Sequence, residues 1–540
     1  MTIEGTVFMT TALIIGSGAS AAGAALALSQ RADIAITVID IGLQLEGERQ
    51  ERAAALAAAA PREWDAATRE YLSQQPVASG SRGVPEKRVF GSNYPFRNVG
   101  QLTGLTAVKG ANSSVVSSAY GGYSNVWGSQ VMPFTDETFE GWPLKAATMR
   151  PHYEAILGHI PFAGEEDDLA ANFPLLRSPG PLPPMAPRSQ RVLDAYAKHR
   201  ATLSRRGITV GKARLAFQAT ECVRCGLCMT GCPYGLIYSA AQTFDGLRRS
   251  GRITYHSGFI ALKIEEAADQ VTVITREIAT DQVRRFEADR VFVACGAMGT
   301  TRLVANSLDL LNVDIPMQES RQFILPFLSR RATEDPRGKD DFTLNQFNMI
   351  VAPDGGPLDV STLHFYAYNK AFVDGLPSVL RARPAAPVQS LLLRRLSVAF
   401  GYLPSWNSPR LRIRVGARDS DTAFPEFHIS SDSAPPGQAA MVSAILRKLA
   451  AAGPALDLYP VLPMFRLAPA AKSYHWGSSF PHADGGQGRF RSDTLGRVGA
   501  WKRTHLVDAS VFPTVPATTY GLTVMANAHR IASESVDLIS

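Results

Sequence analysis

Four cysteines gathered in one short loop are the residues of this chain best placed to bind a metal centre. Cys222, Cys225, Cys228 and Cys232 follow the pattern C-x2-C-x2-C-x3-C and are succeeded by Pro233. Gaps of two residues let neighbouring thiolates reach adjacent irons, and iron–sulphur clusters use this spacing. Because four of the five cysteines lie together, a disulfide framework is disfavoured. The run predicts that this loop holds an iron–sulphur cluster.

Structural zinc and free thiols are the alternatives for this loop. Zinc sites usually use two ligand pairs separated by about a dozen or more residues, so four ligands in so short a run are cramped. Cluster type is open as well, because the fourth cysteine of such a run often binds a second cluster, and no second run exists here. All four cysteines could hold one [4Fe–4S] cluster, three could hold a [3Fe–4S] cluster, or three could combine with Cys295. Cys295 follows an apolar strand and is better interpreted as a buried thiol.

A second candidate site lies near the N-terminus, where a glycine-rich turn follows the apolar run 11–15. Gly16 permits a tight turn, Gly18 lets the backbone approach a pyrophosphate, and the small Ala21 lets helix and strand pack closely. A second predicted strand ends at Asp40, where an acid can accept hydrogen bonds from a ribose. This order of elements predicts a dinucleotide-binding unit, and by itself it does not separate NAD from FAD.

The far end of the chain decides between these cofactors through a resemblance. The turn Asp508-Ala509-Ser510, ahead of an apolar helix predicted at 522–532, resembles the C-terminal signature of the glucose–methanol–choline (GMC) family of flavoenzymes. In that family the turn leads into a helix beside the flavin. Four further segments match in family order, namely 121–128, Trp142-Pro143 with His152-Tyr153, 291–300 running into Leu303 and Ser307, and 474–479. The resemblance covers the whole chain and implies FAD.

The same resemblance implies which residues contact the flavin end of the cofactor. The segment 121–128 matches the flavin-facing loop of the family, and Asp508 and Ala509 match the turn before the last helix. From the loop, the expected cofactor-binding residues are Gly121, Gly122, Ser124 and Asn125.

Oxidation of an alcohol is the chemistry that the resemblance implies, with a base taking the hydroxyl proton while hydride passes from carbon to flavin N5. Histidine suits the role of base, and His475 matches the family histidine, with His482 as a fallback. The second member of the family pair is His or Asn, yet counting back from Thr523 gives Thr519, with Tyr520 beside it. The sequence departs from the family there. A hydroxyl can still donate to an alkoxide-like oxygen, so we expect Thr519 or Tyr520 to assist, although both could be packing at a helix start.

Within the family, the cysteine loop is most similar to that of the iron–sulphur-containing catalytic subunits of bacterial FAD-dependent glucose and fructose dehydrogenases. Those subunits carry three cysteines with gaps of five and three residues, followed by Pro, and Cys222, Cys228 and Cys232-Pro233 match that spacing. Cys225 is additional. It leaves the cluster type open between [3Fe–4S] and [4Fe–4S].

The elements that must position these residues predict an α/β chain, α+β overall, with a split Rossmann-like FAD-binding domain. This domain is expected to take residues 9–150, 205–310 and 495–540, with the cluster loop at 222–233. A substrate domain, built on an antiparallel sheet with helices, is expected to take residues 151–204 and 311–494 with their connections. Paired strands between 252 and 293, and apolar–polar alternation in 410–415, favour this division.

Composition narrows the class of protein. Hydrophobic residues make up 45% and charged residues 19% of the chain, as in ordinary globular proteins. The net charge of +7 is spread along the sequence, which argues against a nucleic-acid partner. No run reaches the roughly 18 uninterrupted apolar residues of a membrane span, and the apolar segment 12–28 lacks the basic start of a signal peptide. We expect no transmembrane segment, and a protein that is cytoplasmic or exported with a partner subunit.

These observations predict an FAD-dependent dehydrogenase that oxidises a CH–OH group of a sugar, polyol or other small-molecule alcohol. Since a cluster accepts one electron at a time, we expect electrons to pass through it to an external acceptor. The acceptor would be a small subunit, a cytochrome or a ferredoxin-like protein. The alternatives are a GMC-type oxidase or reductase with a structural metal site, and a non-catalytic flavoprotein electron carrier.

Overall fold

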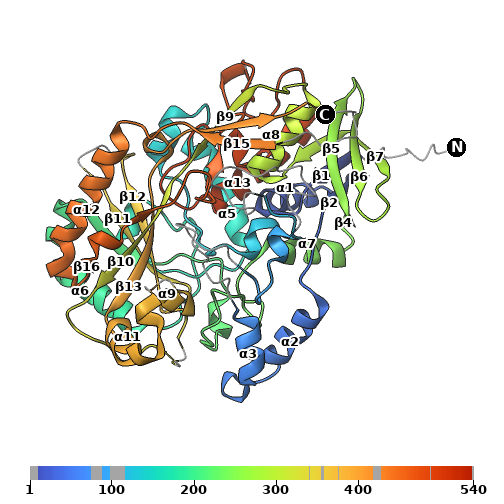
Figure 1. The fold of residues 1–540 in the computed structure, drawn as a ribbon. Coiled ribbons are helices and arrows are strands. Elements are labelled where there is room, and N and C mark those ends of the chain that lie inside the picture. Colours follow the sequence, from blue (N-terminus) through green and yellow to red (C-terminus); the bar gives the residue numbers. More distant parts are fainter. Residues whose placement is uncertain are drawn as a thin grey trace.

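The computed structural model describes residues 10–74, 88–97, 116–337, 339, 341–353, 358–374, 376, 378–417, 427–486 and 488–537. They form two lobes, one around a parallel sheet and the other around an antiparallel sheet (Figure 1). This mixture of helices with parallel and antiparallel sheets confirms the predicted fold class.

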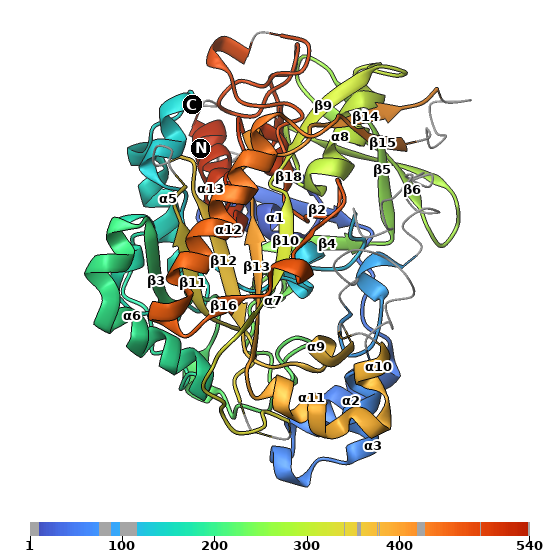
Figure 2. The same ribbon diagram turned by 60° about the vertical axis from the view of Figure 1, so that its left-hand side comes forward.

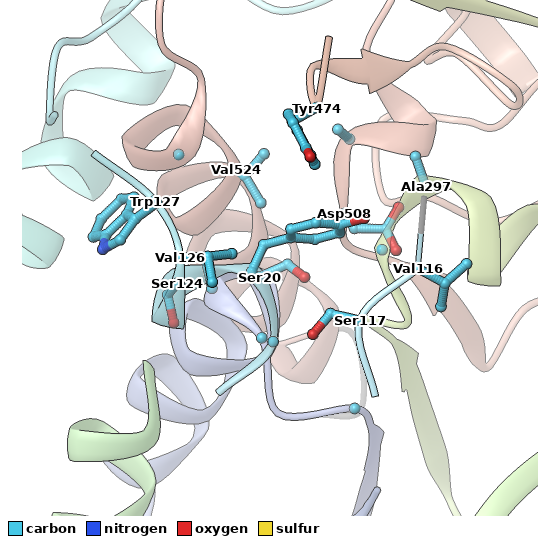
Figure 3. Close-up of a pocket in the computed structure, with 18 of the residues that line it drawn as sticks. Ser20, Val116, Ser117, Ser124, Val126, Trp127, Ala297, Tyr474, Asp508 and Val524 are labelled. Atoms are coloured by element: carbon cyan, nitrogen blue, oxygen red, sulfur yellow. The ribbon is translucent and has the colours of Figure 1, made fainter. Parts of the chain in front are cut away.

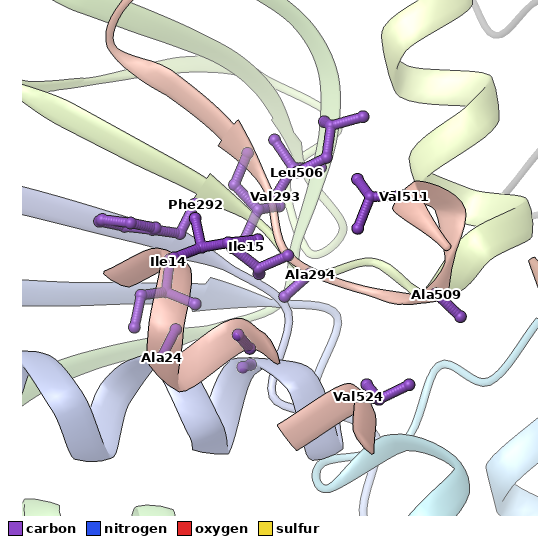
Figure 4. Packing of buried hydrophobic residues seen from close by; sticks show 14 of the residues in the cluster. Ile14, Ile15, Ala24, Phe292, Val293, Ala294, Leu506, Ala509, Val511 and Val524 are labelled. Carbon is purple, nitrogen blue, oxygen red and sulfur yellow. The ribbon is translucent and has the colours of Figure 1, made fainter. Parts of the chain in front are cut away.

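The parallel sheet draws its strands from the beginning, the middle and the end of the chain. Its five strands run in the order β19-β8-β1-β2-β4, and every neighbouring pair is parallel. Sheets of this kind are covered on both faces, which favours apolar strands, as the buried Ile14 of β1 and Val293 of β8 illustrate (Figure 4). The strands are β1 (Thr10–Ile15), β2 (Ile34–Asp40), β4 (Ile253–Ser257), β8 (Arg290–Val293) and β19 (Thr504–Leu506).

Two helices from opposite ends of the chain pack together on this sheet. They are α1 (Ala19–Ser29), which follows β1, and α13 (Gly521–Asp537), near the C-terminus. Gly23 allows the two helices to approach closely because it has no side chain. A Cβ atom at that position would lie 2.2 Å from the carbonyl oxygen of Met525 in α13. The nucleotide-type lobe is therefore completed by the last described helix.

The antiparallel sheet is the larger of the two, and its strand order is β16-β10-β13-β12-β11-β3, with β17 paired to β10. Helices α6 (Pro187–Arg205) and α12 (Gly437–Leu456) cover one face of it (Figure 2). Because side chains alternate between the faces of a strand, the opposite face is left to line a cavity. The strands are β3 (Ile208–Lys212), β10 (Gln322–Leu328), β11 (Asn345–Val351), β12 (Ser361–Tyr366), β13 (Leu396–Tyr402), β16 (Tyr459–Pro460) and β17 (Arg466–Leu467).

Two smaller sheets extend the first lobe. The strands β5 (Phe259–Glu266), β6 (Val271–Glu277) and β7 (Val283–Ala288) form one antiparallel sheet. The other contains β9 (Asp314–Glu319), β14 (Leu411–Val415), β15 (Phe427–Ser431) and β18 (Trp476–Gly477). The alternation expected around 410–415 is present, because Leu411, Ile413 and Val415 are buried and the arginines between them are exposed.

Several strands depart from the predicted division into domains. The strands β9, β14, β15 and β18 were expected in the substrate domain, yet their buried side chains belong to the core of the first lobe. The strand β3 departs in the other direction. The nucleotide-binding domain was expected to include 205–310, yet β3 pairs with β11 and forms an edge of the antiparallel sheet. The apolar stretch of β3 buries Ile208 and Val210 against the core of that sheet, which explains its placement. The other boundaries of the two domains stay a prediction.

The remaining helices surround the two lobes. By length and composition alone, α12 is the one helix of the described ranges that could cross a membrane, and here Met441, Ile445 and Leu449 pack it onto the antiparallel sheet. The other helices are α2 (Gly47–Ala57), α3 (Ala66–Leu72), α5 (Ala146–His159), α7 (Ala240–Arg249), α8 (Gly296–Ser307), α9 (Lys370–Asp374), α10 (Ser378–Arg381) and α11 (Ala386–Leu393).

Candidate active site

A cavity of about 300 Å³ receives side chains from both lobes. On the parallel-sheet side it is lined by Gly16, Gly18 and Asp40, and on the antiparallel-sheet side by Gln322 and Tyr402. In Figure 3, Ser124, Val126 and Trp127 lie on one side of it, Val116 and Ala297 on the other, and Tyr474 and Asp508 between them. The structure thus brings the predicted catalytic residues and most of the predicted cofactor-binding residues to one cavity, whereas Ala21, Gly121 and Asn125 do not line it.

The glycine-rich turn forms one end of this cavity. Gly16 has a φ of 105°, and a Cβ atom there would lie 2.6 Å from the carbonyl oxygen of Ala294. Gly18 caps α1, and no atom lies within 4 Å of where its Cβ would be, so the space beside it is open. The unpaired N–H groups at the start of a helix attract phosphate, so this end fits a pyrophosphate. Ala21 is fully buried, and Gly23 leaves room for α13 to approach α1.

Asp40, at the end of β2, connects the glycine-rich turn to β4 and to the loop at Gly121 through hydrogen bonds. Its carboxylate accepts hydrogen bonds from the hydroxyl of Ser17 and, at 3.2 Å, from that of Tyr255. Ser17 in turn accepts a 2.9 Å bond from the N–H of Gly121. Burial raises the pKa of Asp40 to about 6 in the cofactor-free protein, even though these hydrogen bonds act to lower it. Hydroxyl groups of a ribose would be further donors of the kind that this carboxylate already uses.

Replacement of Asp40 by asparagine should change how stability depends on pH. The carboxyl has a pKa near 3.8 in the unfolded chain and about 6 in the folded protein, so the folded state holds the proton more strongly. Stability from this group is therefore complete below pH 3.8 and is lost as the pH rises through 6, by about 1–3 kcal/mol. We expect Asp40→Asn to abolish this loss in urea unfolding of the cofactor-free protein between pH 4 and 7. Asp484→Asn, at an exposed carboxyl, should keep the wild-type profile.

The predicted flavin-facing loop touches the glycine-rich turn. A Cβ atom at Gly122 would lie 3.0 Å from the Cα of Gly18, and both Gly121 and Gly122 have positive φ angles. Ser124 and Asn125 hold the loop in shape. The hydroxyl of Ser124 accepts a 2.8 Å bond from the N–H of Ala240, and the amide of Asn125 donates to two carbonyl groups of its own loop. Ser124 also lines the cavity, whereas Asn125 acts on the loop itself.

The turn at Asp508 lines the same cavity as this loop. Its carboxylate accepts a 2.9 Å bond from the N–H of Ser510 and another from the hydroxyl of Thr300 on α8. Burial raises the pKa of Asp508. Ala509 lines the cavity, and its carbonyl oxygen accepts a 3.0 Å bond from the N–H of Ser478. These contacts tie the C-terminal turn to the segment that carries His475.

His475 lies between two aromatic rings. Its imidazole stacks on the ring of Tyr402, with centroids 4.5 Å apart and planes inclined by 15°. The ring of Tyr520 meets it edge-on at 4.8 Å. The backbone is held too, since the carbonyl oxygen of His475 accepts a 3.0 Å bond from the N–H of Ser320. The imidazole therefore has a defined orientation at the cavity wall.

The two residues expected to assist His475 differ in the state of their hydroxyl groups. The Tyr520 hydroxyl already donates to the carbonyl oxygen of Tyr474 at 3.0 Å. The Thr519 hydroxyl is buried and has no hydrogen-bond partner among the described residues, and Thr519 lines the cavity. Thr519 is thus the better candidate to donate to a bound alcohol oxygen, and Tyr520 positions the imidazole.

Two single substitutions should separate these roles. Thr519→Val removes the hydroxyl and keeps the shape, so we expect flavin reduction by an alcohol to slow about tenfold with no loss of stability. Tyr520→Phe removes a satisfied hydrogen bond, and it should lower the free energy of unfolding by about 1 kcal/mol while changing the rate less than about threefold. Stopped-flow absorbance and urea unfolding measure the two quantities. The reverse pattern would assign the donor role to Tyr520.

His482, the fallback base, has a structural role. Its Nδ1 lies 2.6 Å from the carbonyl oxygen of Asp493, and its Nε2 lies 3.2 Å from the amide of Asn527. Burial lowers the pKa of His482 to about 3. Both ring nitrogens are engaged, and His482 is not among the residues lining the cavity.

The cysteine loop is curled, with positive φ angles at Arg224, Gly226 and Gly231. Its thiols fall into two groups. Cys222, Cys228 and Cys232 pack against the hydrophobic cluster that contains Leu236 and Phe342, whereas Cys225 is buried with Leu56 and Leu72 under α2 and α3. Burial raises the pKa of the Cys222 thiol to about 11 and that of Cys225 to about 12.

The thiols of this loop are not arranged as metal ligands. Across the described parts of the chain, no group of three or more His, Cys, Asp or Glu side chains could hold a metal ion. The structure as placed therefore gives no support for a metal site in this loop. Met229, directly after Cys228, lines the cavity, so the loop lies beside the candidate active site.

Comparison with known proteins adds a structural likeness. No family model and no curated protein matches the sequence. Pyridoxine 4-oxidase from Mesorbium loti, a solved structure, superposes with a TM-score of 0.59 over 97% of this chain and 99% of that chain, at 13% sequence identity. The two proteins share a fold. At this identity the likeness concerns architecture, and it agrees with the predicted fold class.

Several residues of the site are absent from the sequence-based predictions. Ser17 and Tyr255 hold Asp40 through hydrogen bonds. Gln130 and Gln322 also line the cavity. Ser17 lies inside the glycine motif and could have been noticed there, whereas the others come from segments that carry no motif.

Proposed function

We propose that this protein is a GMC-type FAD-dependent oxidoreductase that oxidises a CH–OH group of a small-molecule alcohol. The observation that carries the proposal is the single cavity that joins the glycine-rich turn, at Gly16 and Gly18, to His475 and Thr519. A cofactor cradle and a candidate base thus share one cavity, as hydride transfer requires. The fold shared with pyridoxine 4-oxidase, an oxidase by its name, supports the same class.

Each part of the cavity has a role in this proposal. FAD, when bound, supplies the acceptor for hydride. The start of α1 would hold its pyrophosphate and Asp40 its ribose, with the glycine loop at 121–122 and the turn at Asp508 around the flavin end. His475 takes the hydroxyl proton of the alcohol on an imidazole nitrogen, and Tyr402 and Tyr520 keep that ring in place.

The proposal is tested by mixing the flavin-loaded protein with a panel of alcohols without oxygen. Loss of the absorbance of oxidised flavin with at least one alcohol supports it. Admission of air followed by a peroxide assay then separates an oxidase from a dehydrogenase. If no alcohol reduces the flavin and His475→Asn changes nothing, the protein is an electron carrier instead.

We also propose that the loop 222–233 binds an iron–sulphur cluster and serves an external electron acceptor. The support is its cysteine spacing, the grouping of Cys222, Cys228 and Cys232 on one side, and the position of Met229 at the cavity. The grouping favours a three-cysteine [3Fe–4S] site with Cys225 outside it. Cluster binding would require the thiols to turn toward one another, since they do not converge as placed.

Iron analysis and electron paramagnetic resonance test this second proposal. A signal in the oxidised protein indicates [3Fe–4S], and one seen only after reduction indicates [4Fe–4S]. With a three-cysteine site, Cys228→Ser should lose iron and the matched variant Cys225→Ser should keep it. Zinc in place of iron, or no metal in protein purified without oxygen, would exclude the cluster.

A further inference from the structure

The antiparallel sheet presents polar side chains to the cavity. In β10, Phe323 belongs to the hydrophobic core while its neighbour Gln322 lines the cavity. In β12, Phe365 is likewise in the core, and His364 and Tyr366 line the cavity. This alternation follows from the pleat of the strands. The sheet side of the cavity therefore carries hydrogen-bonding groups beside the apolar ring of Phe400.

Gln130 and Gln322 are buried in this wall with part of their hydrogen-bonding capacity unused. Gln130 is 2% exposed, and its carbonyl oxygen accepts a 2.9 Å bond from the amide of Asn348. The amide nitrogen of Gln130 has no partner within the described structure. Gln322 is 5% exposed, and its amide nitrogen donates to the hydroxyl of Tyr402 at 2.9 Å, while its carbonyl oxygen has no partner there either. Buried polar groups are almost always satisfied, so a ligand is expected to complete them.

The bonds already made also orient both amides. Asn348 fixes Gln130 so that a donor is left for the cavity, and Tyr402 fixes Gln322 so that an acceptor is left. A hydroxyl group both donates and accepts hydrogen bonds. One donor and one acceptor, separately anchored, therefore suit a ligand with several hydroxyl groups.

Charged side chains lie at the other end of the cavity. Among the described residues that line the cavity, the ones with an Asp, Glu, Lys or Arg side chain are Asp40, Arg302 and Asp508. All three belong to the nucleotide-type lobe and are engaged there, with Ser17, with the carbonyl oxygen of Ala261 and with Thr300. Against the antiparallel sheet, a carboxylate or phosphate group would be buried with no Lys or Arg among the lining residues there, and an ammonium group with no Asp or Glu, which is costly.

We infer that the substrate is an uncharged polyhydroxylated alcohol, such as a neutral sugar or cyclitol, whose non-reacting hydroxyl groups are bound by Gln130 and Gln322. The inference rests on the proposed function for the reaction at His475. It assigns the two glutamines to substrate selection, separate from proton transfer.

The test compares four neutral polyols (glucose, methyl glucoside, sorbitol and inositol) with benzyl alcohol, glycolate and glucose 6-phosphate. Flavin reduction without oxygen gives the rate at saturation and the half-saturating concentration for each. The variants are Gln130→Leu and Gln322→Leu, with Gln438→Leu as the matched control. Gln438 is equally buried, but its amide bonds to Arg321 and Asn407 instead of lining the cavity.

We expect a neutral polyol to be the preferred reductant. Gln130→Leu and Gln322→Leu should each raise its half-saturating concentration about tenfold, with the rate at saturation within about twofold of wild type. Benzyl alcohol should be used equally well or better by both variants, and Gln438→Leu should behave as wild type. Preference for benzyl alcohol or a charged alcohol, or unchanged polyol selectivity in both variants, overturns the inference.

Binding measured by calorimetry separates this inference from the proposed function. If no alcohol reduces the flavin, the proposed function fails, and the inference is decided by binding of the same polyols. Polyol binding that weakens about tenfold in the two glutamine variants supports the inference that Gln130 and Gln322 bind the substrate. Absence of binding at millimolar polyol overturns it.

Discussion

Replacing His475 with asparagine is expected to slow reduction of the flavin by an alcohol by about 10²–10⁴-fold, the usual contribution of a general base. Asparagine keeps a hydrogen-bonding side chain between Tyr402 and Tyr520 but cannot accept the hydroxyl proton. Because the imidazole packs between the rings of Tyr402 and Tyr520, the flavin content should stay at the wild-type level. Stopped-flow absorbance without oxygen measures the rate.

A matched histidine variant controls for this result. His428 lies on β15 and is exposed, so His428→Asn should reduce flavin at the wild-type rate. A rate within about threefold of wild type would remove His475 from the reaction, since that is far below the contribution of a base.

Substitution of Gly23 by valine is expected to prevent formation of the cofactor site. Even the first side-chain atom at this position would lie 2.2 Å from the backbone oxygen of Met525, and backbone cannot move aside as a flexible side chain can. Overpacking of a tight contact costs about 1–3 kcal/mol and sometimes more. We expect the free energy of unfolding to fall by the upper end of this range or more. We also expect loss of flavin, because α1 presents its N-terminus to the cavity. Urea unfolding and the flavin-to-protein ratio report both effects.

Gly246 offers a control within another helix. It lies in α7, and no atom would meet a Cβ atom there within 4 Å. Gly246→Ala should therefore raise the free energy of unfolding by about 0.5–1 kcal/mol, since alanine restricts the unfolded chain and favours helix. Equal stability in the Gly23 and Gly246 variants would show that α1 and α13 can separate without cost.

The parts of the fold that were predictable are those written in contiguous sequence. The strand, the turn with Gly16 and Gly18, the helix and the acid at Asp40 follow one another within about thirty residues, and local patterns report such units. The turn at Asp508 and the segment with His475 were located through short motifs that do not depend on distant pairing.

The rest of the site depends on contacts that no local pattern encodes. Gln322 and Tyr402 meet because β10 pairs with β13, two strands far apart in the chain. Whether Thr519 or Tyr520 has a free hydroxyl depends on the position of the Tyr474 carbonyl. The separation of Cys225 from the other cysteines arises from packing under α2 and α3, which the spacing does not express.

The pairing of α1 with α13 has a consequence for the newly made chain. About 500 residues separate β1 from α13, so at about 5–20 residues per second the ribosome needs about 25–100 s to supply the partner helix. During that time the apolar strands of the parallel sheet lack their cover and expose open edges, which invite association with other chains. Production of this protein should therefore depend on chaperones that shield the amino-terminal segment until synthesis ends.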